Sequence, residues 1–281
     1  MSVAMDVERL TLSESDGVLS VILNRPEKLN AIDRLMESEL SQVLEQADRC
    51  KAIRVVVIQG AGRAFSAGHD ISDGGGAPDA EGVSPPSPQE DLALVREGAG
   101  RFARIMQLSI PVIASVHGYC MGIGTCLALN CDLVVAAEDA EIGFPPVRWG
   151  GSPPTHMWTY LVGPQWAKYM LLTGDTIDGR TAERIGLVFR SVPAAELTTV
   201  AFELAAKMAR IPRDLLVTNK GICNKALDLM GRTTLQQLAH EADVFGHFSP
   251  DAREFFRIVR SSGIKAALEW QQSRFGSSDY R

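Results

Sequence analysis

The sequence predicts an α/β fold in which buried strands alternate with helices. Three segments carry continuous runs of β-branched and other apolar residues, as expected of strands covered on both faces: 55–58, 111–116 and 132–136. Helical periodicity lies between these runs, and after about residue 194 it is the only pattern that remains. We therefore predict an α/β core over residues 1–195 and a helical region over residues 196–281.

The chain opens with a strand and a helix. Residues 18–23 form an apolar, β-rich run, which Asn24-Arg25-Pro26 terminates. Asp33 is placed to cap the following helix, in which apolar residues recur at helical spacing: Leu35, Met36, Leu40, Val43, Leu44 and Ala47. Acidic residues between them, including Glu37 and Glu39, are expected to face solvent, so this helix is predicted to lie on the sheet.

A segment rich in glycine and proline interrupts the core between Asp73 and Pro88. Its composition buries too little apolar surface to offset the entropy lost on ordering. We therefore predict a mobile loop that folds over a bound ligand. Strand and helix patterns resume on both sides, which argues against a linker between domains.

Composition and charge argue against several classes of protein. Hydrophobic residues make up 46% and charged residues 22%, as in ordinary globular proteins. A net charge of −6 without a basic cluster disfavours nucleic acid as a partner. There is no apolar run of about 18 residues and no signal-peptide pattern, so we expect a cytoplasmic protein that does not enter a membrane. The cysteines are odd in number and form no CxxC pair, which favours buried, reduced thiols over disulfides or a zinc site.

Two glycine loops follow buried strands. The first spans residues 65–71, and the second spans residues 118–124 and leads into a helix predicted over 125–130. Small-residue turns let backbone N–H groups point into a cleft, and a helix N-terminus favours negative charge. Either loop alone usually serves only turn geometry. Together they predict a site that holds one oxyanion.

Five motifs then carry a resemblance to a known family: Arg25–Ala31, Arg63–Ile71, Pro111–Tyr119, Cys131–Leu133 and Leu172–Asp175. In order and spacing they resemble the crotonase (enoyl-CoA hydratase/isomerase) superfamily, from about Val18 to Pro193. The resemblance implies a spiral of ββα units with a C-terminal helical region that packs protomers into trimers, often paired as hexamers. It also implies a bound acyl-CoA thioester, with coenzyme A present as part of the substrate and no prosthetic group or metal.

The resemblance also assigns residues to roles. The backbone N–H groups of His69 and Ile123 become the oxyanion donors, and Gly68, Gly122 and Gly124 set the geometry of the two loops. Around the adenine and ribose of coenzyme A the resemblance places Glu27, Lys28, Leu29, Ala67, Asp70 and Ile71. Preorganised donors of this kind each contribute roughly 10²–10³ in rate.

The sequence departs from the hydratase pattern at both catalytic glutamates. Aligned on Cys131 and Asp132, Cys126 stands at the first glutamate position and Pro146 at the second. Proline has no side-chain proton, and a thiol with a pKa near 8.5 needs strong activation before it acts as a base. General acid–base catalysis contributes roughly 10²–10⁴-fold. We therefore predict slow hydration with thioester binding retained.

Substitutes for the missing acid and base come from the first loop, the 144–154 segment and a histidine beyond it: His69, Arg148, Trp149, Ser152 and His156. Arg148 and Trp149 are candidates to line the acyl pocket. Decarboxylating relatives with a similar first loop pair its histidine with a tyrosine where Ser152 or Pro153 stands here, so His69 is expected to act mainly through its backbone. Hydration or isomerisation, decarboxylation or C–C hydrolysis, and binding without catalysis all remain open.

Overall fold

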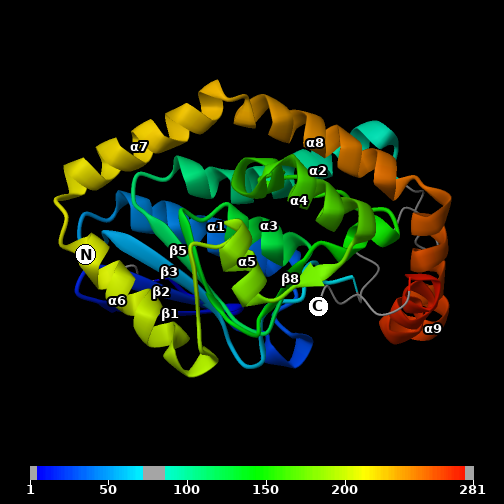
Figure 1. Ribbon diagram of the computed structural model, residues 1–281, viewed down its shortest axis with the longest axis horizontal. Coiled ribbons are helices and arrows are strands. Elements are labelled where there is room, and N and C mark those ends of the chain that lie inside the picture. Colours follow the sequence, from blue (N-terminus) through cyan, green and yellow to red (C-terminus); the bar gives the residue numbers. More distant parts are fainter. Residues whose placement is uncertain (1–4, 72–85, 276–281) are drawn as a thin grey trace.

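A computed structural model describes residues 5–71 and 86–275, and two sheets form its core (Figure 1). The six-stranded sheet contains, in spatial order, β1 (Leu10–Ser15), β2 (Val18–Leu23), β3 (Val55–Gly60), β5 (Val112–Val116), β7 (Leu133–Ala137) and β10 (Arg190–Val192). The four-stranded sheet contains β4 (Ala64–Ser66), β6 (Tyr119–Met121), β8 (Glu141–Gly143) and β9 (Thr176–Ile177). The pairs β1–β2 and β8–β9 are antiparallel, and the others are parallel.

The helices of the described chain are α1 (Arg34–Arg49), α2 (Pro88–Ala103), α3 (Ile123–Leu129), α4 (Trp158–Thr173), α5 (Gly179–Ile185), α6 (Leu197–Ala209), α7 (Arg213–Leu229), α8 (Arg232–His247) and α9 (Pro250–Phe275). Short 3₁₀ helices occupy Pro26–Lys28, Arg104–Gln107, Pro145–Arg148 and Ala194–Glu196. One strand of each sheet followed by a helix forms a unit that repeats as β3-β4-α2, β5-β6-α3 and β7-β8-α4. This repeat confirms the predicted α/β spiral of ββα units.

The predicted strands and the first helix are present where the sequence placed them. The strands β2, β3, β5 and β7 coincide with the apolar runs to within one or two residues, and nearly all of their residues are buried. The Asp33 carboxylate caps α1 by accepting the Met36 N–H at 2.8 Å. The helix after the second glycine loop begins at Ile123, two residues earlier than predicted, because Gly122 with φ +56° turns the chain directly into it.

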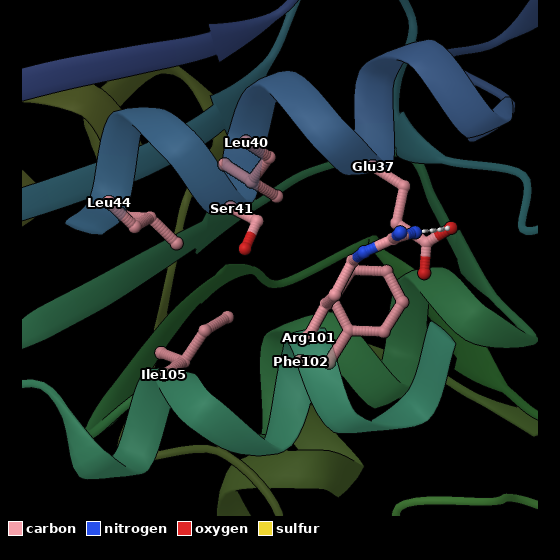
Figure 2. Close-up of a pocket in the computed structure, with 7 residues that line it drawn as sticks. All are labelled: Glu37, Leu40, Ser41, Leu44, Arg101, Phe102 and Ile105. Atoms are coloured by element: carbon pink, nitrogen blue, oxygen red, sulfur yellow. Dashed lines mark ion pairs between the residues drawn. The ribbon is translucent and has the colours of Figure 1, made fainter. Parts of the chain in front are cut away.

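The expectation that Glu37 and Glu39 face solvent was wrong, since both are buried. Glu39 accepts the backbone N–H groups of Glu8 and Arg9, each at 2.9 Å. Glu37 pairs with Arg101 of α2 at 3.0 Å, beside a small pocket between α1 and α2 (Figure 2). Partners from other elements thus offset the cost of burial for Glu39, and for Glu37 only in part, because Glu37 Oε1 has no hydrogen-bond partner within the described residues and burial raises the Glu37 pKa. Helical periodicity does not reveal such partners.

The helical region begins at α6, but this helix packs on the large sheet and fully buries Ala201 and Ala205 there. Figure 1 shows α7 and α8 as an arch along one side of the core, with α9 at its far end. The division predicted at residues 195 and 196 therefore marks a change in secondary structure, while the first helix beyond it shares the main core. Within the described residues, no helix has the length and apolar character needed to cross a membrane.

Two other sequence expectations have mixed outcomes. Residues 73–85 of the predicted mobile loop lie outside the described residues, and its last part belongs to α2, where Ser87 forms a capping box with Glu90. The cysteines are free thiols, and Cys120, Cys126 and Cys131 are buried as expected. The expectation of burial was wrong for Cys223, which is exposed on α7.

Candidate active site

The first glycine loop presents an unused backbone donor at His69. Ile32 donates its N–H to the Gly68 carbonyl at 2.8 Å and accepts the Asp70 N–H at 3.0 Å. Because these bonds flank His69, its own N–H points away from Ile32. Within residues 5–71 and 86–275 this N–H has no hydrogen-bond acceptor. The loop thus holds one donor ready for a ligand.

The second loop places another donor beside the first. Ile123 begins α3, so its N–H has no acceptor within the helix, and it has none elsewhere in the described chain. Gly68 has φ +102°, and a Cβ added there would lie 3.0 Å from the Met121 carbonyl oxygen and 3.7 Å from the Ile123 nitrogen. The loops therefore touch at Gly68, and two unused N–H groups border one small region.

Gly124 is needed because α3 packs directly on the first loop. A Cβ at Gly124 would lie 2.7 Å from the Ser66 Cβ and 3.0 Å from the Ser66 carbonyl oxygen. The Ser66 hydroxyl in turn donates to the Asn30 carbonyl at 2.9 Å and accepts the Gly68 N–H at 3.2 Å. Each predicted loop glycine therefore occupies a position where the backbone conformation or the close approach excludes a larger side chain.

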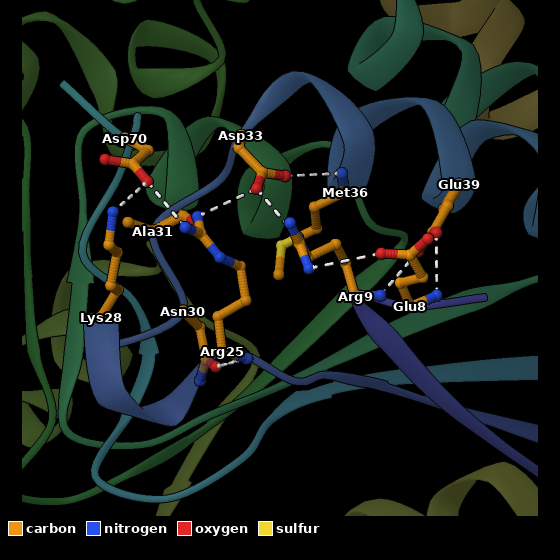
Figure 3. A network of polar contacts seen from close by, with 10 residues as sticks. All are labelled: Glu8, Arg9, Arg25, Lys28, Asn30, Ala31, Asp33, Met36, Glu39 and Asp70. Atoms are coloured by element: carbon orange, nitrogen blue, oxygen red, sulfur yellow. Dashed lines mark hydrogen bonds and ion pairs between the residues drawn. The ribbon is translucent and has the colours of Figure 1, made fainter. Parts of the chain in front are cut away.

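A buried polar network anchors the first loop to residues 25–31 (Figure 3). The Asn30 amide donates to the carbonyls of Ala61 and Ala64, at 2.8 and 2.7 Å, and its oxygen accepts the Arg25 N–H at 2.9 Å. The Arg25 guanidinium pairs with Asp70 at 2.8 Å. Lys28 also reaches Asp70, at 3.2 Å. The network fixes the backbone on both sides of His69.

The same network brings together the residues predicted to hold coenzyme A. Residues 27–29 and 67–71 lie side by side, because the Ala67 N–H donates to the Leu29 carbonyl at 2.9 Å and Lys28 pairs with Asp70. Ile71 instead packs with α9 in a small apolar cluster. Contact of these residues with coenzyme A stays a prediction.

Replacing Asn30 with alanine should destabilise the fold by about 3 kcal/mol or more. The change leaves two carbonyls and one N–H without partners at a fully buried position, and each unsatisfied group costs roughly 1–3 kcal/mol. Urea unfolding followed by circular dichroism measures the loss. Asn219→Ala on exposed α7 is the matched control, and an equal effect in both variants would contradict the assignment.

The two positions of the missing glutamates lie at the second loop. Cys126 is buried in α3, and burial raises the pKa of its thiol to about 12. The thiol is therefore neutral at physiological pH and no base. The Pro146 ring lies against the second loop, since a Cβ on Gly122 would be 3.5 Å from the Pro146 Cγ. Neither position supplies a proton-transfer group.

Arg148 and Trp149 have structural partners. Arg148 donates to the Thr173 carbonyl at 2.7 Å and to Asp175 at 2.6 Å, which ties it to the end of α4. Trp149 stacks on Phe255 of α9, with ring centroids 4.3 Å apart. Both residues thus fasten the segment after β8 to neighbouring helices, and a contact with an acyl group stays a prediction.

His156 and Ser152, the other candidates for the missing acid and base, also have structural partners. His156 bonds the Thr159 hydroxyl at 2.8 Å, at the start of α4, and burial lowers its pKa. Among the described residues its hydrogen-bond partner is thus on α4 and not in a glycine loop. Ser152 contributes its backbone, since its N–H donates to the Asp243 carboxylate at 2.7 Å. That carboxylate comes from α8, a helix that supplied no sequence candidate.

Sequence reasoning missed a polar stripe on the buried face of α8. The residues Gln236, His240, Asp243 and His247 lie at helical spacing on the face that packs against α2. His247 bonds Asp91 of α2 at 2.8 Å and lies 3.6 Å from Asp243. The sequence signal that could have revealed this stripe was its helical spacing. Polar residues recur there at the positions where an amphipathic helix normally carries buried apolar residues.

The side chain of His69 lies near this stripe. Burial and the positive charge of His247 lower the His69 pKa, with a hydrogen bond to the Ile32 backbone opposing them. Its imidazole is therefore neutral near pH 7. His69 in the first loop and Cys126 next to the second loop are therefore both close enough to α8 for its charged residues His247 and Asp243 to act on them.

Comparisons with known proteins identify the family of this chain. The family model described as enoyl-CoA hydratase/isomerase matches residues 13–277. A hydroxycinnamoyl-CoA hydratase-lyase of Pseudomonas fluorescens is 36% identical over 69% of this chain and 70% of its own length. A 2,3-dehydroadipyl-CoA hydratase of Escherichia coli K12 is 34% identical over 73% of this chain and 77% of its own. The crystal structure of an enoyl-CoA hydratase from Mycobacterium smegmatis superposes with a TM-score of 0.90, at 31% identity, over 98% of this chain and 96% of that one.

Proposed function

The chain belongs to the enoyl-CoA hydratase/isomerase family, and from that premise we propose that it is an enzyme that binds an acyl-CoA thioester and stabilises its enolate. The backbone N–H groups of His69 and Ile123 form the oxyanion hole in this proposal. Coenzyme A enters as part of the substrate, held by residues 27–29 and 67–71, and no prosthetic group takes part.

One observation carries the proposal: two adjacent loops each present a backbone N–H without an acceptor in the described chain. When a bond at the α-carbon of a thioester breaks, negative charge moves to the thioester oxygen. Donors already in place stabilise that charge without reorganising. Because the donors at His69 and Ile123 belong to the backbone, they persist while side chains around them change.

Isothermal titration calorimetry with butyryl-CoA tests binding, and exchange of the butyryl α-protons in D₂O, followed by mass spectrometry, tests enolate formation. We expect binding and slow deuterium uptake. A chain that binds no acyl-CoA at millimolar concentration contradicts the proposed function.

Two alternatives to hydration or isomerisation follow from the lost glutamates. In decarboxylation or C–C hydrolysis the departing group itself generates the enolate, so the neutral thiol of Cys126 and the proline at 146 are no obstacle. The Pseudomonas relative is named a hydratase-lyase, and this name supports carbon–carbon bond cleavage as an alternative reaction. Binding without catalysis is the other alternative. Turnover of malonyl- and β-ketoacyl-CoA thioesters separates the two.

We propose a homotrimer or hexamer in the cytoplasm. Leu229 at the end of α7 is 84% exposed and Phe245 on α8 is 81% exposed, and association of protomers would cover such residues. Light scattering should return the mass of three or six chains. A single-chain mass across micromolar concentrations would exclude this assembly.

A further inference from the structure

We propose that the carboxylate of Asp243, which lies beside His247, is the acid–base group of this site and moves the α-proton of the bound thioester. The inference rests on the proposed function and deepens it, because it gives proton transfer to α8 in place of the two missing glutamates.

A series of hydrogen bonds and packing contacts connects the Asp243 carboxylate to the second loop. Its Oδ1 accepts the Ser152 N–H at 2.7 Å. The preceding residue, Gly151, donates its N–H to the Pro146 carbonyl at 2.8 Å, and Pro146 lies against Gly122. Asp243 also acts electrostatically on the Cys126 thiol, whose pKa it helps to raise. A buried carboxylate thus lies near the place of the first family glutamate.

The other oxygen of Asp243 remains available for chemistry. The nearest donor to Oδ2 is His247 Nε2 at 3.6 Å, longer than a hydrogen bond, and no closer donor reaches this oxygen within the described residues. His247 directs its other ring nitrogen to Asp91 at 2.8 Å. A purely structural ion pair would close the Asp243–His247 distance, whereas here the imidazole is held by Asp91 and one carboxylate oxygen is left open.

The charges around Asp243 suit a base at physiological pH. Burial raises the pKa of Asp243 to about 6, against the opposing charge of His247, and Asp91 adds to the increase. Burial alone would favour neutral His247, but its bond to Asp91 and the charge of Asp243 outweigh this and raise its pKa. The neutral groups facing the pair are His69 and Cys126. Above about pH 6 Asp243 is therefore mostly a carboxylate and can accept a proton.

The proposed step balances without any further reactant. The Cα–H bond of the thioester breaks, its proton passes to Asp243 Oδ2, and its electron pair forms the enolate whose oxygen is held by the N–H groups of His69 and Ile123. When the proton on Asp243 exchanges with a deuteron of the solvent before the return step, reprotonation of the α-carbon gives deuterium exchange. Return of the proton to the γ-carbon of a 3-enoyl thioester instead gives isomerisation. A single acid–base group is enough for either reaction.

The test is α-proton exchange of butyryl-CoA in D₂O, measured for the full chain, Asp243→Asn, His247→Gln and Glu241→Gln. Asp243→Asn keeps an oxygen for the Ser152 N–H but removes the base, so exchange should fall at least about 100-fold while the butyryl-CoA Kd changes less than about threefold. His247→Gln should move the midpoint of the rate–pH curve from near 6 to higher pH, because the imidazolium no longer favours the carboxylate. Glu241→Gln, at an exposed position of α8, should change neither quantity.

The outcomes separate this inference from the proposed function. A chain that neither binds nor exchanges butyryl-CoA overturns the proposed function. Exchange that is equally fast in Asp243→Asn overturns the role of Asp243 alone. Binding without exchange overturns both that role and the enolate chemistry of the proposed function, and leaves only thioester binding. If Asp243→Asn fails to fold, the His247→Gln profile decides, and an unshifted midpoint contradicts the proposal.

Discussion

Gly68→Ala is expected to lower α-proton exchange by about 10²–10³-fold, as loss of an oxyanion donor does in other enzymes. The added methyl group would lie 3.0 Å from the Met121 carbonyl oxygen and 3.7 Å from the Ile123 nitrogen, in the region bordered by both proposed donors. It would either exclude the thioester oxygen or push the loops apart. Exchange of butyryl-CoA protons in D₂O, with binding measured by calorimetry, gives the rate and affinity separately.

The control for Gly68→Ala must carry the same backbone strain without filling the site. Gly163 also has a positive φ, +71°, but a Cβ there meets no atom within 4 Å. Gly163→Ala should therefore lose a similar amount of stability, about 1–3 kcal/mol, and keep its exchange rate. If both variants lose activity equally, strain explains the effect and the contact between the loops at Gly68 does not.

The sequence predicts the parts of this fold that are set by local patterns. Apolar runs locate β2, β3, β5 and β7, and Asp33 locates the start of α1 because a cap acts on residues next to it in the chain. The glycines at 68, 122 and 124 are also predictable from the sequence, since only glycine suits their backbone conformation or their close contacts. These features depend on neighbours in sequence or on the absence of a side chain.

Features that depend on distant partners are not predictable in this way. Glu37 and Glu39 are buried only because Arg101 and two backbone N–H groups approach from other elements. Asp243 accepts a hydrogen bond from Ser152, which lies 91 positions earlier in the chain. A helical pattern marks a face as buried or exposed, but it does not identify the residues that pack against that face. The role of the polar stripe on α8 depends on such residues, among them Ser152 and Asp91.

Hydration of crotonyl-CoA should be at least 10²-fold slower than in a hydratase with both glutamates, while binding of the thioester stays intact. Addition of water requires one group to activate the water and another to protonate the α-carbon. The thiol of Cys126 stays protonated because burial raises its pKa to about 12, and Pro146 has no proton to exchange. A hydration assay and calorimetry on one preparation measure both quantities.

Cys126→Glu tests whether the lost carboxyl explains slow hydration. The Cys126 side chain is electrostatically coupled to Asp243, so glutamate would create a pair of carboxyl groups on a backbone that superposes closely with an enoyl-CoA hydratase. Hydration should rise by more than about tenfold, because a second proton-transfer group becomes available.

Cys223→Glu on exposed α7 is the control and should leave the rate unchanged. The double variant Cys126→Glu with Asp243→Asn should lose the gain, since only one carboxyl remains. Fast hydration by the unmodified chain would contradict the argument and direct the search for a base to His69, Ser152 or His156.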